Sequence, residues 1–167
     1  MKRNVSFVTT VAAAASAAAA ALWLAVPAAA SPAGPAVSGT EHFQTLTTSF
    51  TSNTAGIIAT GVFTAGGIRH RASKVDTFVF PNGTFKVAHS GRGGTQTLDP
   101  KTCLLTIPGH GIVTMSGGTG KYAGIRGHGT YQANFLGIEA RSGGKCTLKK
   151  PATSWQQIIK VVAHVSQ

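Results

Sequence analysis

The chain has 167 residues, with 15 Lys or Arg against four Asp or Glu, so its net charge at pH 7 is +11 when the histidines are neutral. This length fits a single domain with one core. The basic residues are scattered and aromatic residues do not alternate with them, which argues against a dedicated nucleic-acid surface.

The first 30 residues have the pattern of a secretory signal peptide. Lys2 and Arg3 give a positive start, a long apolar run rich in alanine follows, and Ala28-Ala29-Ala30 offers small residues to signal peptidase. Cleavage after Ala30 would leave 137 of the 167 residues. We therefore predict a secreted, extracellular protein with no transmembrane anchor after cleavage, and a flexible leader over residues 31–40.

From residue 41 to residue 167 the chain is typical of β structure. Thr, Val, Ile and Phe are frequent, and Gly, Pro or Asn interrupts the chain about every eight to twelve residues. Seven or eight strands in one domain predict an all-β sandwich or a closed barrel, and composition does not separate the two. The predicted strands are Phe43–Thr51, Ile57–Thr64, Lys74–Phe80, Thr84–Ser90, Thr102–Ile107, Ile112–Ser116, Gly129–Gly137 and Trp155–Val165.

A hairpin is predicted around Pro81-Asn82-Gly83. Pro81 has no N–H for the ladder beside a two-residue Asn-Gly turn, which favours a three-residue loop with Gly83 at positive φ. That register places Val75 opposite His89, whereas a two-residue Asn-Gly turn would pair Asp76 with His89 on one apolar face. A shift of one residue therefore decides whether Asp76 and His89 share a face, and turn chemistry favours the register in which they do not.

Cys103 and Cys146 are the only cysteines. In an exported protein we expect them to form an intramolecular disulfide, with a nucleophilic thiol or a metal ligand as the alternative. The chain-entropy model gives such a bond a stabilising effect of about 4 kcal/mol.

A glycine-rich run between predicted strands, residues 117–127, reads Gly-Gly-Thr-Gly-Lys-Tyr-Ala-Gly-Ile-Arg-Gly. It is not a phosphate-binding loop, because Met115 stands where that motif needs its first glycine and Tyr122 where it needs Ser or Thr. Residues 119–124 can form one helical turn. The glycines expected to make a tight connection with close backbone approach are Gly117, Gly118, Gly120, Gly124 and Gly127.

This run resembles the signature of the allene oxide cyclase and dirigent barrels, which in dirigents is roughly Gly-Gly-Thr-Gly, two residues, then Ala-Arg-Gly. The chain differs at Ile125, where Ala is usual, and at Tyr122, where Phe is common. The hairpin at 80–85 and the cysteine spacing also resemble small exported bacterial proteins expected to share this barrel. The resemblance implies a single antiparallel eight-stranded barrel over residues 41–167, often trimeric, with an apolar cavity. In plants that cavity folds an unsaturated fatty-acid epoxide or steers phenoxy-radical coupling.

Neither family's catalytic residues can be placed on this sequence, so the resemblance carries the fold and not the activity. Of the acidic residues Glu41, Asp76, Asp99 and Glu139, Asp76 could act as a base with a raised pKa in a cavity. A carboxylate hydrogen-bonded to a neighbouring turn or to His89 is its more ordinary role. The candidate ligand-binding residues are Asp76, His89, Tyr122, Arg126 and Tyr131.

None of the six histidines has the spacing of a zinc motif, so no metal or cofactor is predicted. His110 and His128, each between glycines, could meet if their strands are neighbours. The sequence thus predicts a secreted barrel that binds a small apolar ligand. One alternative is an isomerase, cyclase or dirigent-type enzyme acting on an unsaturated lipid or phenolic compound. The other is a basic protein that adheres to anionic polymers.

Overall fold

The computed structural model describes residues 37–49 and 51–167, which belong to one compact unit. The predicted signal peptide and most of the predicted leader lie outside the described residues. Within the described ranges, no helix is long and apolar enough to cross a bilayer.

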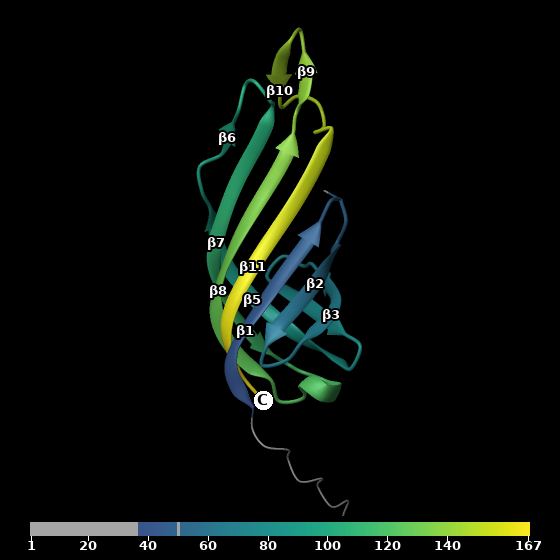
Figure 1. Cartoon of the computed structure of the whole chain (residues 1–167), viewed down its shortest axis with the longest axis vertical. Coiled ribbons are helices and arrows are strands. Elements are labelled where there is room, and N and C mark those ends of the chain that lie inside the picture. Colours follow the sequence, from purple (N-terminus) through teal and green to yellow (C-terminus); the bar gives the residue numbers. More distant parts are fainter. Residues whose placement is uncertain (1–36, 50) are drawn as a thin grey trace, which may run out of the picture. The chain divides into compact units, whose positions relative to one another are not determined.

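Eight antiparallel strands of the described chain close into a barrel (Figure 1). The closing seam is the pairing of β5 with β7, which runs from Lys86 opposite Ser116 to Gly93 opposite Gly109. The all-β, eight-stranded antiparallel barrel is therefore confirmed, and the sandwich alternative is excluded. In spatial order the strands are β5 (Gly83–Gly93), β4 (Val75–Phe80), β3 (Ala65–His70), β2 (Thr54–Gly61), β1 (Ser38–Thr47), β11 (Ser154–Ser166), β8 (Arg126–Ile138) and β7 (Leu104–Ser116).

Two strands differ from the prediction. β3 was not predicted, because Gly66-Gly67 is typical of a turn, yet a side chain on Gly67 would overlap the backbone carbonyl of Val79 on β4. The glycine permits a close approach between two strands rather than a turn. β7 was predicted as two strands, but it continues through Pro108, whose carbonyl accepts a hydrogen bond from the N–H of Gly94.

The strands β7, β8 and β11 extend beyond the other barrel strands and form a sheet extension (Figure 1). β8 and β11 pair as far as Ile138 opposite Ser154, whereas β1 ends its pairing with β11 at Gln157. β6 (Thr97–Leu98) pairs with the start of β7, and a small hairpin of β9 (Ala140–Ser142) and β10 (Lys145–Thr147) follows β8.

The disulfide between Cys103 and Cys146 joins this hairpin to the residue before β7. The two Cα atoms are 5.4 Å apart, and 43 residues separate them in the sequence. The predicted pairing is confirmed, and neither cysteine is free.

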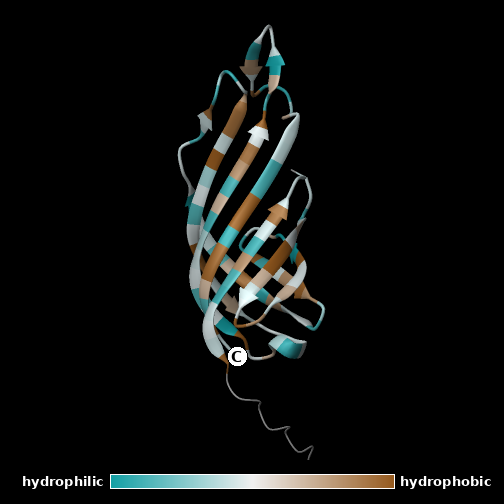
Figure 2. Ribbon diagram, viewed as in Figure 1, coloured by the Kyte–Doolittle hydropathy of each residue, from teal (hydrophilic) through white to brown (hydrophobic). Residues whose placement is uncertain are grey.

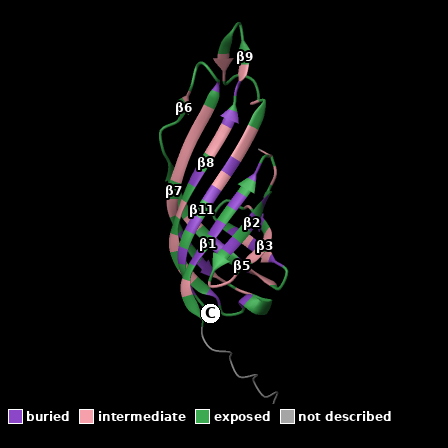
Figure 3. Cartoon of the chain, viewed as in Figure 1, coloured by how far each residue is buried: buried purple, intermediate pink, exposed green. Residues whose placement is uncertain are grey.

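Side chains alternate between the barrel interior and its surface, as the pleat of a strand requires (Figure 3). Along β1, Phe43 and Thr45 are buried while His42 and Gln44 are exposed. Hydropathy does not alternate strictly along the long strands, because apolar neighbours such as Ile158 and Ile159 occur on β11 (Figure 2).

One end of the barrel is filled by an aromatic plug. Most of its ring pairs pack edge-on or tilted, with centroids 5.4 Å apart for Phe43 and Phe78 and 5.0 Å apart for Phe63 and Tyr122, and one pair, Phe80 and Phe85, is stacked. Tyr122 enters from η1 (Gly120–Tyr122), the helical turn predicted from the glycine-rich run. The members of the aromatic plug are Phe43, Phe63, Phe78, Phe80, Phe85 and Tyr122.

The β4–β5 hairpin adopts a register that neither sequence alternative predicted. Phe80 pairs with Gly83, so only Pro81 and Asn82 form the turn. At the first turn position Pro81 needs no N–H, which removes the conflict on which the predicted three-residue loop rested. The preferred prediction was therefore wrong.

Contacts with the glycine-rich run hold the hairpin in this register. The N–H of Lys121 donates to the carbonyl of Asn82 at 2.7 Å, and the N–H of Thr119 donates to the carbonyl of Thr84 at 2.8 Å. The tight packing explains two of the glycines, since a side chain on Gly120 would overlap the Asn82 carbonyl and one on Gly118 would overlap the Tyr122 carbonyl. Tertiary contacts, absent from any local turn rule, thus decide the pairing.

Candidate functional site

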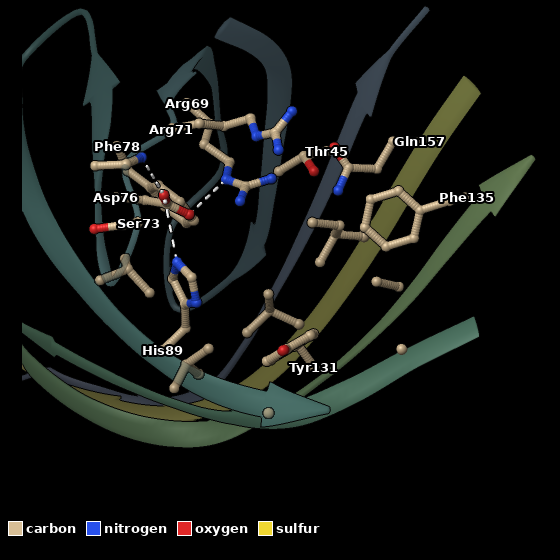
Figure 4. Close-up of a pocket in the computed structure, with 18 of the residues that line it drawn as sticks. Thr45, Arg69, Arg71, Ser73, Asp76, Phe78, His89, Tyr131, Phe135 and Gln157 are labelled. Atoms are coloured by element: carbon tan, nitrogen blue, oxygen red, sulfur yellow. Dashed lines mark hydrogen bonds and ion pairs between the residues drawn. The ribbon is translucent and has the colours of Figure 1, made fainter. Parts of the chain in front are cut away.

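Beyond the aromatic plug the barrel interior opens into a cavity of about 390 Å³. This volume lies within the roughly 300–1,000 Å³ of small-molecule sites. Most of its apolar side chains come from β7, β8 and β11, whereas its charged side chains come from β3, β4, β5 and the residues between β3 and β4 (Figure 4). The apolar lining comprises Phe78, Val87, Val113, Ala133, Phe135, Ile159 and Val161, and the polar lining includes Thr45, Arg69, Arg71, Ser73, Asp76, His89, Tyr131 and Gln157.

Asp76 is the centre of the polar wall and is only 3% exposed. Its Oδ2 accepts a hydrogen bond from Nε of Arg69 at 2.7 Å, and its Oδ1 accepts one from the N–H of Ala72 at 3.0 Å. Nε2 of His89 lies 3.5 Å from the same Oδ1 (Figure 4). Burying a carboxylate is costly unless it has partners of this kind.

The hairpin register brings Asp76 and His89 together. Asp76 pairs with Val87, and His89 is two residues further along the same strand, so both side chains point into the barrel. Both oxygens of Asp76 accept hydrogen bonds, one from Arg69 and one from Ala72, which matches the hydrogen-bonded role weighed in the sequence rather than a free base.

Tyr131 occupies the seam between β5 and β7. A side chain on Gly91 would overlap its hydroxyl, and one on Gly111 would lie 2.6 Å from its Cε1. Its ring lies edge-on to His89, with centroids 6.4 Å apart. Two inward-facing glycines opposite each other therefore make room for one aromatic residue in the cavity wall.

Several buried polar atoms in this wall have no hydrogen-bond partner among the described residues. They include Nη1 of Arg69, which is 7% exposed, and Oε1 of Gln157, which is 3% exposed. Arg71 extends from the end of β3 into the same space as Arg69 (Figure 4). Buried polar groups without a partner are rare in folded proteins, and each needs a partner such as a water molecule, an ion or a ligand group.

The structure brings three of the five predicted ligand residues together and places two elsewhere. Asp76, His89 and Tyr131 line the cavity. Tyr122 is buried in the aromatic plug, and Arg126 is exposed at the start of β8, so neither lines the cavity.

Sequence reasoning missed Arg69, Arg71 and Gln157. The two arginines are two residues apart, the spacing of side chains on one face of a strand, but the signal needs β3 to be recognised first. Gln157 lies in a predicted strand, and its inward position follows from alternation with the buried Ile159.

The histidines of the described chain do not form a common site. His110 lies opposite Gln132 and accepts a hydrogen bond from Nε of Arg92 at 3.3 Å, so it does not meet His128. His128 instead faces His164 on the barrel surface, with ring centroids 6.4 Å apart. Across residues 37–49 and 51–167, no three His, Cys, Asp or Glu side chains form a group that could hold a metal ion.

A second buried carboxyl, that of Glu41, belongs to the plugged end. Its Oε2 accepts a hydrogen bond from the N–H of Phe63 at 3.0 Å, and its Oε1 has no partner in the described chain. Burial raises the pKa of Glu41 above its ordinary value. Burial, and then the nearby Glu41, also raise the pKa of Tyr122.

No protein-family model, curated protein or solved structure matches this chain. The similarity to the allene oxide cyclase and dirigent barrels therefore stays a prediction, and the function must be argued from the cavity itself.

Proposed function

We propose that this protein is a secreted carrier that binds a small, mostly apolar molecule in the barrel cavity. The cavity is the observation that supports this, because an apolar hollow with a few convergent polar groups is the usual form of a small-molecule site. Export is supported by the signal-peptide pattern and by the disulfide, which persists in oxidising compartments.

Native mass spectrometry of the secreted, unreduced protein tests the proposal first. The intact mass should correspond to cleavage after Ala30 and to the loss of two hydrogens at the disulfide. Increasing the activation energy should then release a bound small molecule, whose mass gives its chemical class.

A cavity-filling pair of variants tests whether binding takes place inside the barrel. Ala133 is buried and lines the cavity, whereas its neighbour Asn134 is exposed on the outer face. Ala133→Leu should weaken binding of the neutral fluorescent probe N-phenyl-1-naphthylamine at least about tenfold, while Asn134→Leu should leave it unchanged. Equal binding by both variants and the unaltered protein would place the probe outside the cavity and defeat the proposal.

An isomerase is the second candidate, and one observation favours it. The imidazole of His89 lines the cavity, and its Nε2 lies 3.5 Å from Oδ1 of Asp76. Such an imidazole could take a proton from a carbon beside a carbonyl group and return it to another carbon, with no co-reactant needed. Retained ligand should then take up solvent deuterium, and His89→Gln should stop that uptake without changing probe affinity. If His89→Gln exchanges at the original rate, this role is excluded.

A further inference from the structure

The charges inside the cavity do not balance. Arg69 and Arg71 contribute two guanidinium groups to the lining, and Asp76 is the lining's one carboxylate. Arg92 also borders the cavity, but its Nε is bonded to His110 on the outer face. Because Arg69 is paired with Asp76, the positive charge of Arg71 stays unmatched among the described residues, beside an apolar surface, which favours an anion in the cavity.

The guanidinium group of Arg69 is only partly used by its protein partner. Its Nε is used by Asp76, whereas its buried Nη1 has no acceptor within the described residues. Asp76 thus fixes one side of the guanidinium fork, and Nη1 on the other side stays buried beside the cavity without an acceptor in the described chain. Arg71 reaches into the same space (Figure 4) and has no ion-pair partner in the described chain.

We infer that the ligand is an organic acid with a single negative charge, held by Arg69 and Arg71, whose apolar body lies against Val113, Ala133 and Val161. One carboxylate or sulfonate supplies the missing acceptor for Nη1 and cancels the unmatched charge, and planar guanidinium forks suit such groups. Asp76 is a positioning residue here, because it acts on the ligand through Arg69. The inference rests on the proposed carrier function and specifies which ligands that function serves.

A pair of dyes with one skeleton separates the acidic group from the apolar body. The two probes are 1-anilinonaphthalene-8-sulfonate and N-phenyl-1-naphthylamine, which share the anilinonaphthalene rings and differ by the sulfonate. A charge-assisted hydrogen bond is worth about 1.5–3 kcal/mol, so the unaltered protein should bind the sulfonate at least about tenfold more tightly. Arg69→Gln and Arg71→Gln should each remove most of that preference while leaving the affinity for the neutral dye within about twofold.

Arg126→Gln is the matched control, because it removes the same charge from an exposed position outside the cavity. It should leave both affinities within about twofold, which excludes attraction by the overall positive charge. Arg71→Gln also keeps the test decisive if Arg69→Gln fails to fold, since Arg71 is only half-buried and leaves the Asp76 pair intact.

The results separate this inference from the function on which it rests. Equal affinity for the two dyes, or an equal loss in Arg126→Gln and Arg71→Gln, overturns the organic-acid ligand and leaves an apolar carrier. Failure of both dyes to bind overturns the carrier itself, and the inference with it.

Discussion

Replacing Asp76 with Asn should destabilise the barrel by about 3 kcal/mol, because it removes one partner from a buried ion pair. The side chains of Arg69 and Asp76 are 8% and 4% exposed and their charged atoms are 2.7 Å apart. Loss of one partner of such a pair costs roughly 3–5 kcal/mol, and the cavity beside Arg69 places this site at the lower end.

Thermal and urea unfolding, followed by circular dichroism, measure this loss. A stability change of 1 kcal/mol shifts the melting temperature of a domain of this size by about 3–5 °C, so Asp76→Asn should melt roughly 10–15 °C lower. The double variant Arg69→Met/Asp76→Leu removes both charges and should lie within about 1 kcal/mol of the unaltered protein.

Two results would refute this reasoning. A loss below about 1 kcal/mol in Asp76→Asn would mean that water in the cavity solvates Arg69 well enough to replace the carboxylate. A double variant as unstable as the single one would mean that Asp76 acts through its bond to Ala72 rather than through the ion pair.

Three other predictions concern parts of the molecule away from the cavity. Cys103→Ser/Cys146→Ser should lower the free energy of unfolding by about 4 kcal/mol, as expected for a 43-residue loop, and reducing agent should then have no further effect on its urea midpoint. The pKa of Glu41 is raised in the folded protein, so the native state binds its proton more tightly than the unfolded state does. The free energy of unfolding should therefore fall as the pH rises from about 4.5 through the raised pKa. Urea titrations of Glu41→Gln should lack this loss of stability. Gly118→Ala should cost more than about 2 kcal/mol because its methyl group would overlap the Tyr122 carbonyl, whereas Gly66→Ala, which meets no atom within 4 Å, should melt close to the unaltered protein.

The all-β class, the disulfide and most strands could be predicted because they depend on local signals. Alternating apolar residues and turn residues mark the strands, and two cysteines in an exported chain leave a single pairing. The eight-stranded barrel came from the resemblance carried by the glycine-rich run. Its closure depends on the pairing of β5 with β7, which no local pattern encodes.

The errors arose where contacts between distant segments overrode local rules. The hairpin register depends on hydrogen bonds from residues 119 and 121, which lie far along the chain from its turn. β3 was missed because it contains Gly66-Gly67, and the two arginines of the cavity were therefore missed as well. Tyr122 and Arg126 were predicted as ligand-binding residues because both belong to the glycine-rich run. The side chain of Tyr122 lies in the aromatic plug, and that of Arg126 is exposed on the surface.

The pairing of β1 with β11 has a consequence for biogenesis. β11 supplies the partner of both β1 and β8, and at the ends of these strands Val37 and Gln167 exchange two backbone hydrogen bonds. If the chain is exported as we propose, β1 and β8 are both open edges that can pair with other chains until β11 has crossed the membrane. Contacts so distant in sequence also form slowly. A chain exported through the predicted signal peptide would therefore complete its barrel only after translocation ends, and its unpaired edges would need protection from neighbouring copies until then.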